Sequence, residues 1–361
     1  MSWISTSLQV SLQESYGHQI NQMGSMDGTT PLVSVITTVY NHSAFLKDCL
    51  DGLVMQETSF PYEVIVHDDA STDGSDGIIR EYAQKYPDLI RPIFQKENQY
   101  SKKVSITRTF IHPIVRGKYI AMCEGDDYWT DPHKLQRQVD FLESHTEFVM
   151  ACSRARMYSV KRGKEIGELY CREDDGPLAL KDIVNRSGLF IPTCSIVYRR
   201  SLRSSLPEFI CRAIVGDYPL QIFAALSGGV YYFNDAMTVY RVDNPDSWMG
   251  RQRWKDASEA SLRRVSSMVE MFNGFAEAYP EHRKLFKDKI AQYLRDQMPC
   301  PMYDYDGFRK YTDRFKVYLK EESLLWKLDY WLRGTRLPVL RHYYFHSEFL
   351  VRKYRKRVSL Y

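Results

Sequence analysis

The fold is decided by the segment VSVITTVYNH (residues 33–42), an apolar run that ends in a polar turn. The β-branched residues of this run favour a short buried strand. A second apolar run, EVIVH (63–67), follows, and apolar residues at helical spacing occur in 45–53 and in 78–83. An alternation of strands and helices predicts parallel strands joined by crossover helices. We therefore expect an α/β domain.

Acidic side chains follow two of the predicted strands. Asp68 and Asp69 come directly after the second run, and Asp126 and Asp127 lie beyond a third run, YIAM (119–122). Ligands of open parallel sheets bind beyond the carboxyl ends of the strands, so we expect these side chains to meet at one site. Adjacent carboxylates at a buried strand end repel each other, and a divalent cation would relieve that repulsion while holding a diphosphate. A solvated acidic turn is the alternative.

Three segments taken in order resemble the inverting family 2 glycosyltransferases: PLVSVITTVYN (31–41), DDASTD (68–73) and GDD (125–127). Any one of these motifs is weak evidence, whereas the ordered set is strong. The resemblance covers roughly residues 31–248. It implies the GT-A fold, an α/β, Rossmann-like fold with a mostly parallel central sheet and flanking helices, and it implies a nucleotide-sugar donor.

The resemblance also implies functional residues. Asp69 would accept a hydrogen bond from the uracil ring of a UDP-sugar, and Asp127 would bind Mn²⁺ or Mg²⁺ directly. Asp217, in the segment GDYPL (216–220), would take the proton of the acceptor hydroxyl, although it would also serve as the N-cap of the helix that follows. The further donor-binding residues would be Thr38, Tyr40, Asn41, Arg108, Asp126, Arg241 and Trp248.

Several of these assignments have alternatives. Asn41 is equally suited to be a helix N-cap, and Arg108 to be a solvated surface arginine. Glu124 and the aspartates at 174–175 are weaker candidates for the base. Asp243 stands near the position where family members frequently carry histidine, which weakens a metal-ligand role there.

The chain divides into three predicted regions. Residues 1–30 are polar and predict a mobile N-terminal extension, residues 31–250 form the GT-A glycosyltransferase domain, and residues 251–361 form a helical C-terminal region. Apolar stripes at 262–275 and 285–294 indicate two helices in the last region.

The composition is that of a folded globular enzyme. Hydrophobic residues make up 44% and charged residues 26% of the chain, and a net charge of +4 excludes a protein that binds polyanions over its whole surface. The seven cysteines are widely spaced, which favours buried thiols over a disulfide framework or a zinc site. Neither a signal peptide nor a membrane span is expected, so we predict a cytoplasmic location.

The C-terminal tail, residues 331–361, combines eight Lys or Arg residues and several aromatic residues with a single acidic residue, Glu348. This composition suits the surface of an anionic membrane. Nucleic-acid binding and a solvated basic face on a packed helix are the alternatives. The membrane interpretation is favoured because many family members act on lipid-linked acceptors at the cytoplasmic face.

These observations predict a cytoplasmic glycosyltransferase, peripheral on the inner face of the membrane. It would move a hexose or N-acetylhexosamine from a UDP-sugar, with inversion, to a glycan or lipid-linked saccharide acceptor in polysaccharide (O-antigen or capsule) assembly. No nucleic-acid partner is expected.

Two other classes of protein were weighed. A metal-dependent nucleotidyltransferase would need a glycine-rich, basic phosphate loop, which residues 37–43 do not provide. A non-catalytic membrane or nucleic-acid adaptor would not need Asp69, Asp127 and Asp217 together.

Overall fold

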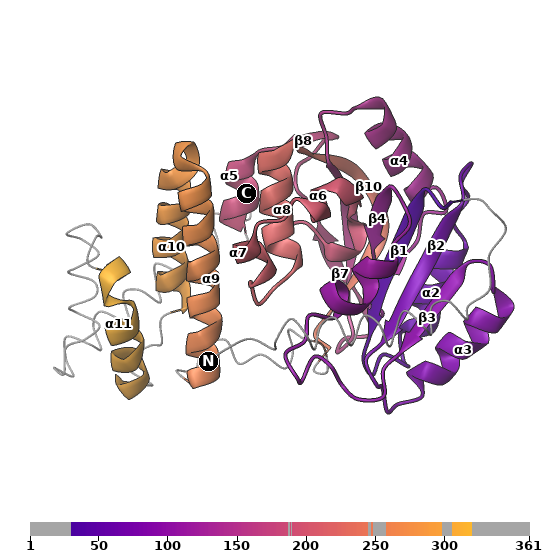
Figure 1. Ribbon diagram of the computed structural model, residues 1–361, viewed down its shortest axis with the longest axis horizontal. Helices are drawn as coiled ribbons and strands as arrows, with labels where there is room; N and C mark the ends of the chain where they lie inside the picture. Colours follow the sequence, from indigo (N-terminus) through magenta and orange to yellow (C-terminus); the bar gives the residue numbers. More distant parts are fainter. Residues whose placement is uncertain are drawn as a thin grey trace.

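The computed structural model describes residues 30–186, 188, 190–244, 247, 258–297 and 305–319. It shows an α/β body with helices α9, α10 and α11 at one side (Figure 1). The prediction of an α/β fold with a mostly parallel central sheet, flanking helices and a helical C-terminal region is confirmed. Residues 1–29 and the C-terminal tail lie outside the described residues, so the predicted domain boundaries stay predictions.

The central sheet has the strand order β3-β2-β1-β4-β9-β6-β10-β5, with β7 paired to β6 and β8 to β10. The strands are β1 (Val33–Val39), β2 (Tyr62–Asp68), β3 (Ile90–Phe94), β4 (Tyr119–Met122), β5 (Tyr128–Trp129), β6 (Met150–Ser159), β7 (Lys164–Leu169), β8 (Gly176–Leu178), β9 (Val197–Arg199) and β10 (Val230–Val242). From β3 to β4 the neighbouring strands are parallel, whereas β9 runs antiparallel to both β4 and β6. The predicted strand–helix–strand alternation thus forms the parallel half of the sheet.

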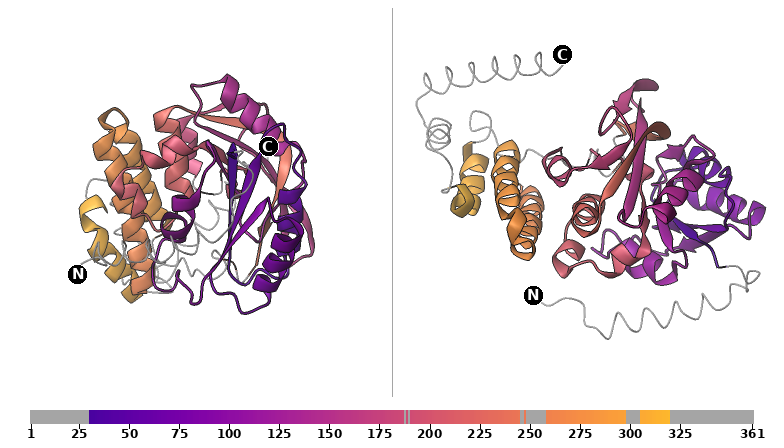
Figure 2. Two further views of the ribbon diagram at one scale, coloured as in Figure 1. Left: turned by 45° about the vertical axis from the view of Figure 1, so that its right-hand side comes forward. Right: turned by 90° about the horizontal axis from the view of Figure 1, so that it is seen from above.

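Helices cover both faces of the sheet (Figure 2). They are α2 (Leu46–Val54), α3 (Ser75–Lys85), α4 (Lys134–Ser144), α5 (Leu180–Arg186), α6 (Arg200–Ser204), α7 (Glu208–Cys211), α8 (Asp217–Ser227), α9 (Glu259–Ala278), α10 (Arg283–Gln297) and α11 (Tyr305–Leu319), with a π-helical turn η1 (Thr107–Ile111) and short 3-10 turns η2 (His112–Ile114), η3 (Thr193–Ser195) and η4 (Pro280–His282).

Alternation along β1 gives the two faces separate cores. Val35 packs into a core that includes residues of α2, α3 and α4, and its neighbour Ile36 packs into a second core with residues of α5, α8, α9 and α10. Both side chains are buried because each face of the sheet is covered. The sheet is thereby held between two layers of helices, and its strand ends are left to carry the polar residues.

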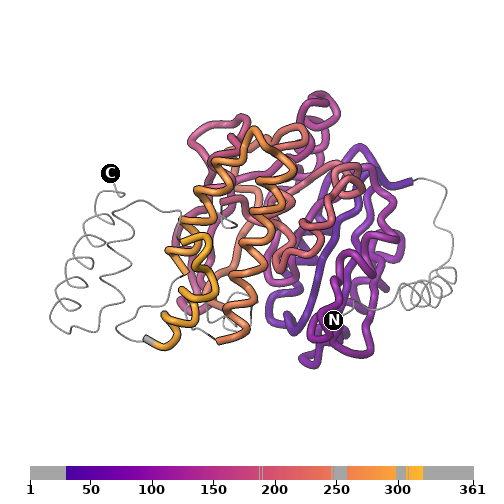
Figure 3. The backbone as a smooth tube through the Cα atoms, turned by 60° about the vertical axis from the view of Figure 1, so that its left-hand side comes forward, coloured from indigo at the N-terminus to yellow at the C-terminus, as the bar shows by residue number. Residues whose placement is uncertain are grey.

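The two C-terminal stripes form helices as predicted. α9 buries Leu262 and Phe272, α10 buries Phe286 and Ile290, and the two helices pack side by side (Figure 3). Each helix therefore contributes its apolar face to the second core.

The segment between α5 and α6 contains a short turn followed by a short strand. The carbonyl oxygen of Pro192 accepts a hydrogen bond from the Ser195 N–H (3.0 Å), which closes the 3-10 turn η3 and leaves only Val197–Arg199 as a strand. Proline has no N–H to give to a neighbouring strand, so a turn at this position is favoured.

Candidate active site

The acidic loop, residues 123–127, leaves β4 and runs beside the carboxyl end of β1. The Cys123 N–H donates to the Ile36 carbonyl (3.2 Å) and the Gly125 N–H donates to the Thr38 carbonyl (3.1 Å). A Cβ at position 125 would lie 2.8 Å from Nδ1 of His42, so a larger residue there would displace the His42 side chain. The loop thus carries Asp126 and Asp127 to the edge of the sheet expected from the sequence.

Asp127 is buried, with an exposed fraction of 2%. Its Oδ1 accepts a hydrogen bond from the Arg241 N–H (2.7 Å), and its Oδ2 has no hydrogen-bond partner among the described residues. Burial raises the pKa of Asp127 well above its ordinary value, and the nearby carboxylates of Asp126 and Glu124 raise it further. A buried carboxylate oxygen that lacks a partner fits a role as a cation ligand.

The protein itself supplies few ligands for such a cation. In the part of the chain that the structure describes, no group of three or more His, Cys, Asp or Glu side chains could hold a metal ion. A cation at Asp127 would therefore take most of its ligands from the phosphates of a substrate and from water, which is the usual arrangement for Mg²⁺.

Thr38 lies in the last residues of β1, and Tyr40 and Asn41 lie in the turn that follows the strand. Asn41 adopts a left-handed backbone conformation (φ 58°). Its N–H donates to Oγ of Ser71 (2.9 Å), and its Oδ1 accepts from the Thr72 N–H (2.8 Å). Asn41 therefore joins the turns after β1 and β2, and the alternative of an N-cap is wrong because α2 begins only after Phe45.

Further hydrogen bonds link the same two turns. The Ser43 N–H donates to Oδ2 of Asp73 (2.8 Å), and the His42 N–H donates to Oγ of Ser75 (3.1 Å). Partial burial acts to raise the pKa of Asp73, but hydrogen bonds from the side chains and backbone N–H groups of Ser75 and Ser43 outweigh it and lower that pKa to about 2. Asp73 is thus ionised across the physiological pH range and holds both turns.

Asp69 lies beside the acidic loop, because its N–H donates to the carbonyl of Val39 at the end of β1 (2.9 Å). Its side chain is 1% exposed, and its two oxygens accept hydrogen bonds from the N–H groups of Gln99 (2.8 Å) and Tyr100 (3.0 Å). The carboxylate therefore anchors the loop that follows β3. A uracil ring would have to approach Asp69 beside these two N–H groups, and the uracil contact stays a prediction.

Asp217 is the first residue of α8, and its Oδ2 accepts a hydrogen bond from Oγ1 of Thr193 (3.0 Å). Burial raises the pKa of Asp217. Desolvation by the surrounding protein raises the pKa of Glu124, and the negative charges of Asp126 and Asp217 raise it further. Burial raises the pKa of Tyr240, and the carboxylates of Asp127, Glu124 and Asp217 add to that shift. The fold thus brings Asp217 to the acidic loop.

Comparison with known proteins assigns the chain to a family. The family model for glycosyl transferase family 2 matches residues 34–206. An uncharacterized protein of Mycobacterium tuberculosis is 33% identical over 254 residues, which cover 68% of this chain and 70% of the relative. The chain belongs to glycosyl transferase family 2.

Two further proteins are similar to this glycosyltransferase. The putative teichuronic acid biosynthesis glycosyltransferase TuaG of Bacillus subtilis is 32% identical over 117 residues, which cover 32% of this chain and 44% of TuaG. The crystal structure of S. aureus TarS 1-349 in complex with UDP has a TM-score of 0.50 and 17% sequence identity, over 83% of this chain and 78% of that chain. The likeness to TarS shows the fold, and the predicted GT-A fold is confirmed.

Arg108 is paired with a residue outside the acidic loop. Arg108 lies on η1, is 48% exposed, and its Nη2 lies 3.6 Å from Oε2 of Glu208 on α7. A role near a diphosphate stays a prediction for this residue. Trp248, another of the expected donor-binding residues, lies outside the described residues.

His42 is a site residue of the glycosyltransferase that the sequence interpretation missed. Its Nε2 lies 4.0 Å from Oδ2 of Asp126, and its imidazole packs against Gly125. Its place directly after Tyr40 and Asn41, in the turn assigned to the nucleotide, is the signal that could have identified it.

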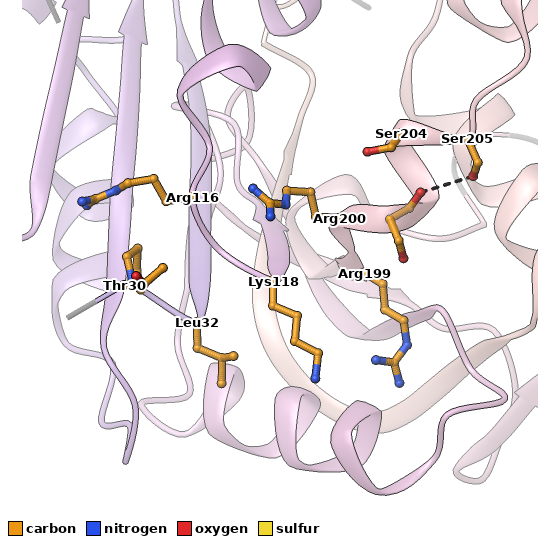
Figure 4. Close-up of a pocket in the computed structure, with 10 residues that line it drawn as sticks. Thr30, Leu32, Arg116, Lys118, Arg199, Arg200, Ser204 and Ser205 are labelled. Atoms are coloured by element: carbon orange, nitrogen blue, oxygen red, sulfur yellow. Dashed lines mark hydrogen bonds between the residues drawn. The ribbon is translucent and has the colours of Figure 1, made fainter. Parts of the chain in front are cut away.

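A cavity of about 870 Å³ lies at the opposite, amino ends of β1 and β4 (Figure 4). It is lined by Arg116, Lys118, Arg199 and Arg200 among others. Their basic groups point in different directions in Figure 4, and Arg116 and Lys118 are paired with the carboxylates of Glu63 and Glu143. This cavity is therefore distinct from the acidic site of the glycosyltransferase.

Proposed function

We propose that this glycosyltransferase transfers a hexose or N-acetylhexosamine from a UDP-sugar, with inversion, to a glycan or lipid-linked saccharide acceptor. The observation that carries the proposal is the placement of Asp69, Asp127 and Asp217 around the carboxyl end of β1 and the acidic loop. Asp69 is the candidate for contact with the nucleotide, Asp127 for the cation and Asp217 for the base.

The acidic loop would bind the leaving group of the reaction, the nucleoside diphosphate. The unpartnered Oδ2 of Asp127 fits Mn²⁺ or Mg²⁺, and either ion, when bound, would neutralise the negative charge on the departing nucleoside diphosphate. Asp126, which is half-buried and near His42, would contact the ribose or a metal-bound water.

Asp217 would act as the base. The acceptor oxygen forms a bond to the anomeric carbon while the bond from that carbon to the diphosphate oxygen breaks, and the electron pair leaves with the diphosphate. The proton of the acceptor hydroxyl passes to the Asp217 carboxylate. Thr193, which donates a hydrogen bond to Oδ2 of Asp217, would orient that carboxylate.

The biological setting is proposed from the relatives. TuaG carries the name of a putative teichuronic acid biosynthesis enzyme, which supports a role in bacterial polysaccharide assembly. The TarS structure holds UDP, which agrees with a uridine donor.

Calorimetric titration of the purified protein tests the donor and the metal together. UDP should bind more tightly with Mn²⁺ than with EDTA, because a cation held by Asp127 would offset the negative charge of the diphosphate. CDP should bind more weakly than UDP, because cytosine lacks the ring N–H that Asp69 would accept. Equal affinity for UDP and CDP would contradict the uracil contact, and equal affinity with and without Mn²⁺ would contradict the metal site.

Membrane association is proposed from the sequence of the C-terminal tail, which lies outside the described residues. Among the helices in the described ranges, none is long and apolar enough to cross a membrane. We propose that the tail attaches the enzyme to the cytoplasmic face of the membrane.

Deletion of residues 333–361 is expected to leave UDP binding intact and to weaken binding to vesicles that contain anionic lipid. Each Lys or Arg near such a surface contributes about 1 kcal/mol, so high salt should weaken binding of the full chain in the same way. Vesicles of neutral lipid are the control in a co-sedimentation assay. Unchanged binding of the truncated protein to anionic vesicles would show that the tail is not the anchor.

A further inference from the structure

Arg241, near the carboxyl end of β10, joins the acidic loop to α2. Its Nη1 donates a hydrogen bond to the carbonyl oxygen of Asp126 (2.8 Å), and its Nη2 is paired with the carboxylate of Asp48 on α2. Its guanidinium carbon lies 4.4 Å from the ring centre of Tyr128 and 5.1 Å from that of Phe45. The planar cation is thus held at its edges by hydrogen bonds and at its faces by aromatic rings.

The Arg241 side chain is 6% exposed. To reach a diphosphate it would have to give up the Asp126 carbonyl, the Asp48 carboxylate and the ring contacts. A buried charge that loses its partners is costly, so the observed arrangement favours a role within the protein.

The contacts of Arg241 leave the acidic carboxylates open to a cation. The guanidinium bonds to the backbone carbonyl of Asp126, and only the backbone N–H of Arg241 reaches the Asp127 carboxylate. That N–H uses Oδ1 of Asp127 and leaves Oδ2 without a partner among the described residues. The positive charge of Arg241 is offset by Asp48, which reduces its repulsion of an incoming cation.

We propose that Arg241, anchored by Asp48, is a positioning residue that holds the acidic loop in the geometry a divalent cation requires. The inference rests on the proposed metal site at Asp127. It assigns a role to Asp48, which no sequence motif indicated. It also means that Arg241 contacts the acidic loop and not, as expected for a donor-binding residue, the donor.

Three variants test this role: Arg241→Met removes the charge and the forked donors, Arg241→Lys keeps only the charge, and Asp48→Asn alters the anchor without touching the loop. Free Mn²⁺ measured by electron paramagnetic resonance, at saturating UDP, reports metal affinity directly. Loss of a partner that orients a metal ligand typically weakens metal binding about 10-fold to 100-fold. We expect that loss for Arg241→Met, a smaller loss of the same sign for Asp48→Asn, and incomplete rescue by lysine.

Arg154 provides the matched control. It also pairs with a carboxylate (Glu168), donates to an amide oxygen (Asn234) and lies 5.4 Å from the centre of a tyrosine ring (Tyr170), but it sits on β6. Arg154→Met should leave Mn²⁺ affinity unchanged.

UDP affinity in EDTA separates the positioning role from a diphosphate contact. We expect this metal-free affinity to be unchanged in all three variants. If Arg241→Met lost as much UDP affinity in EDTA as in Mn²⁺, the proposal would be overturned in favour of a diphosphate contact. Unchanged Mn²⁺ affinity in Asp48→Asn, a substitution at a half-exposed side chain that the fold should tolerate, would also overturn it.

A failure of the proposed metal site itself would look different. If the unmodified protein bound no Mn²⁺ in the presence of UDP, the metal function would be wrong and the positioning role with it. If the unmodified protein bound Mn²⁺ and the variants bound it equally well, only the positioning role would be wrong.

Discussion

Asp217→Asn is expected to reduce turnover by about 10²-fold to 10⁴-fold, the range that general-base catalysis contributes, while UDP affinity stays unchanged. Asparagine keeps the shape of the side chain and can still accept the hydrogen bond from Thr193, but it cannot take the acceptor proton. Steady-state rates and calorimetric titration with UDP on the same preparation measure both effects. A loss of UDP affinity as large as the loss of rate would mean that Asp217 serves binding or folding.

The matched control is Asp174→Asn, which changes an exposed aspartate that was a weaker candidate for the base. It should leave turnover unchanged. If Asp174→Asn lost activity while Asp217→Asn kept it, the assignment of the base would pass to Asp174.

The pH profile provides an independent check on the base. Burial raises the pKa of Asp217 above the ordinary value of 3.8, and a base works only when deprotonated. Turnover should therefore fall as the pH drops through this raised pKa, so the acidic limb lies above the ordinary aspartate range. The residual activity of Asp217→Asn should lack that limb.

Asp127→Ala is expected to reduce turnover by about 10²-fold or more, because it removes a main group that stabilises charge on the leaving diphosphate. The same change should abolish the effect of Mn²⁺ on UDP binding, since Oδ2 of Asp127 is the proposed ligand. Rates at saturating donor and titrations with and without Mn²⁺ check the two results separately.

Thermal unfolding must first show that Asp127→Ala is folded, because the wild-type Oδ1 accepts the Arg241 N–H. Near-normal turnover of the folded variant would remove Asp127 from the reaction. Asp73→Ala is the comparison for the metal effect alone: it should weaken UDP binding by loosening the two turns, but the gain in UDP affinity from Mn²⁺ should persist, because the bonds of Asp73 hold the turns and not the acidic loop.

Local patterns were enough to predict the parallel half of the sheet and the acidic loop. The run at 119–122 is apolar and the run at 33–39 is mostly β-branched because both faces of their strands are buried, and charged or amide side chains follow where each strand ends. The position of Asp127 can therefore be recognised from the few residues of sequence around it. Asp217 has no such local signal, and it was identified through the resemblance to the family.

The partners of these residues could not be predicted, because they come from distant parts of the chain. The N–H groups that hold Asp69 lie in a loop that has no periodic pattern, and Arg241 meets Asp48 across 193 positions of sequence. A tertiary contact of this kind depends on the sum of all the packing between the two residues. The antiparallel strand β9 is also hard to recognise in the sequence, since three residues are too few to show a period of two.

The hydrogen bonds between the turns after β1 and β2 have a consequence for the entropy of nucleotide binding. Because Asn41 and Asp73 tie the two turns together, the segments move as a single unit before any ligand arrives. Ordering a loop residue costs about 1–2 kcal/mol in conformational entropy. Because these turns are ordered when the chain folds, that cost does not arise again when a ligand binds. If the base and ribose bind at these turns as proposed, they would meet a surface that is already ordered, and their contacts would not be opposed by the entropy of ordering these two segments.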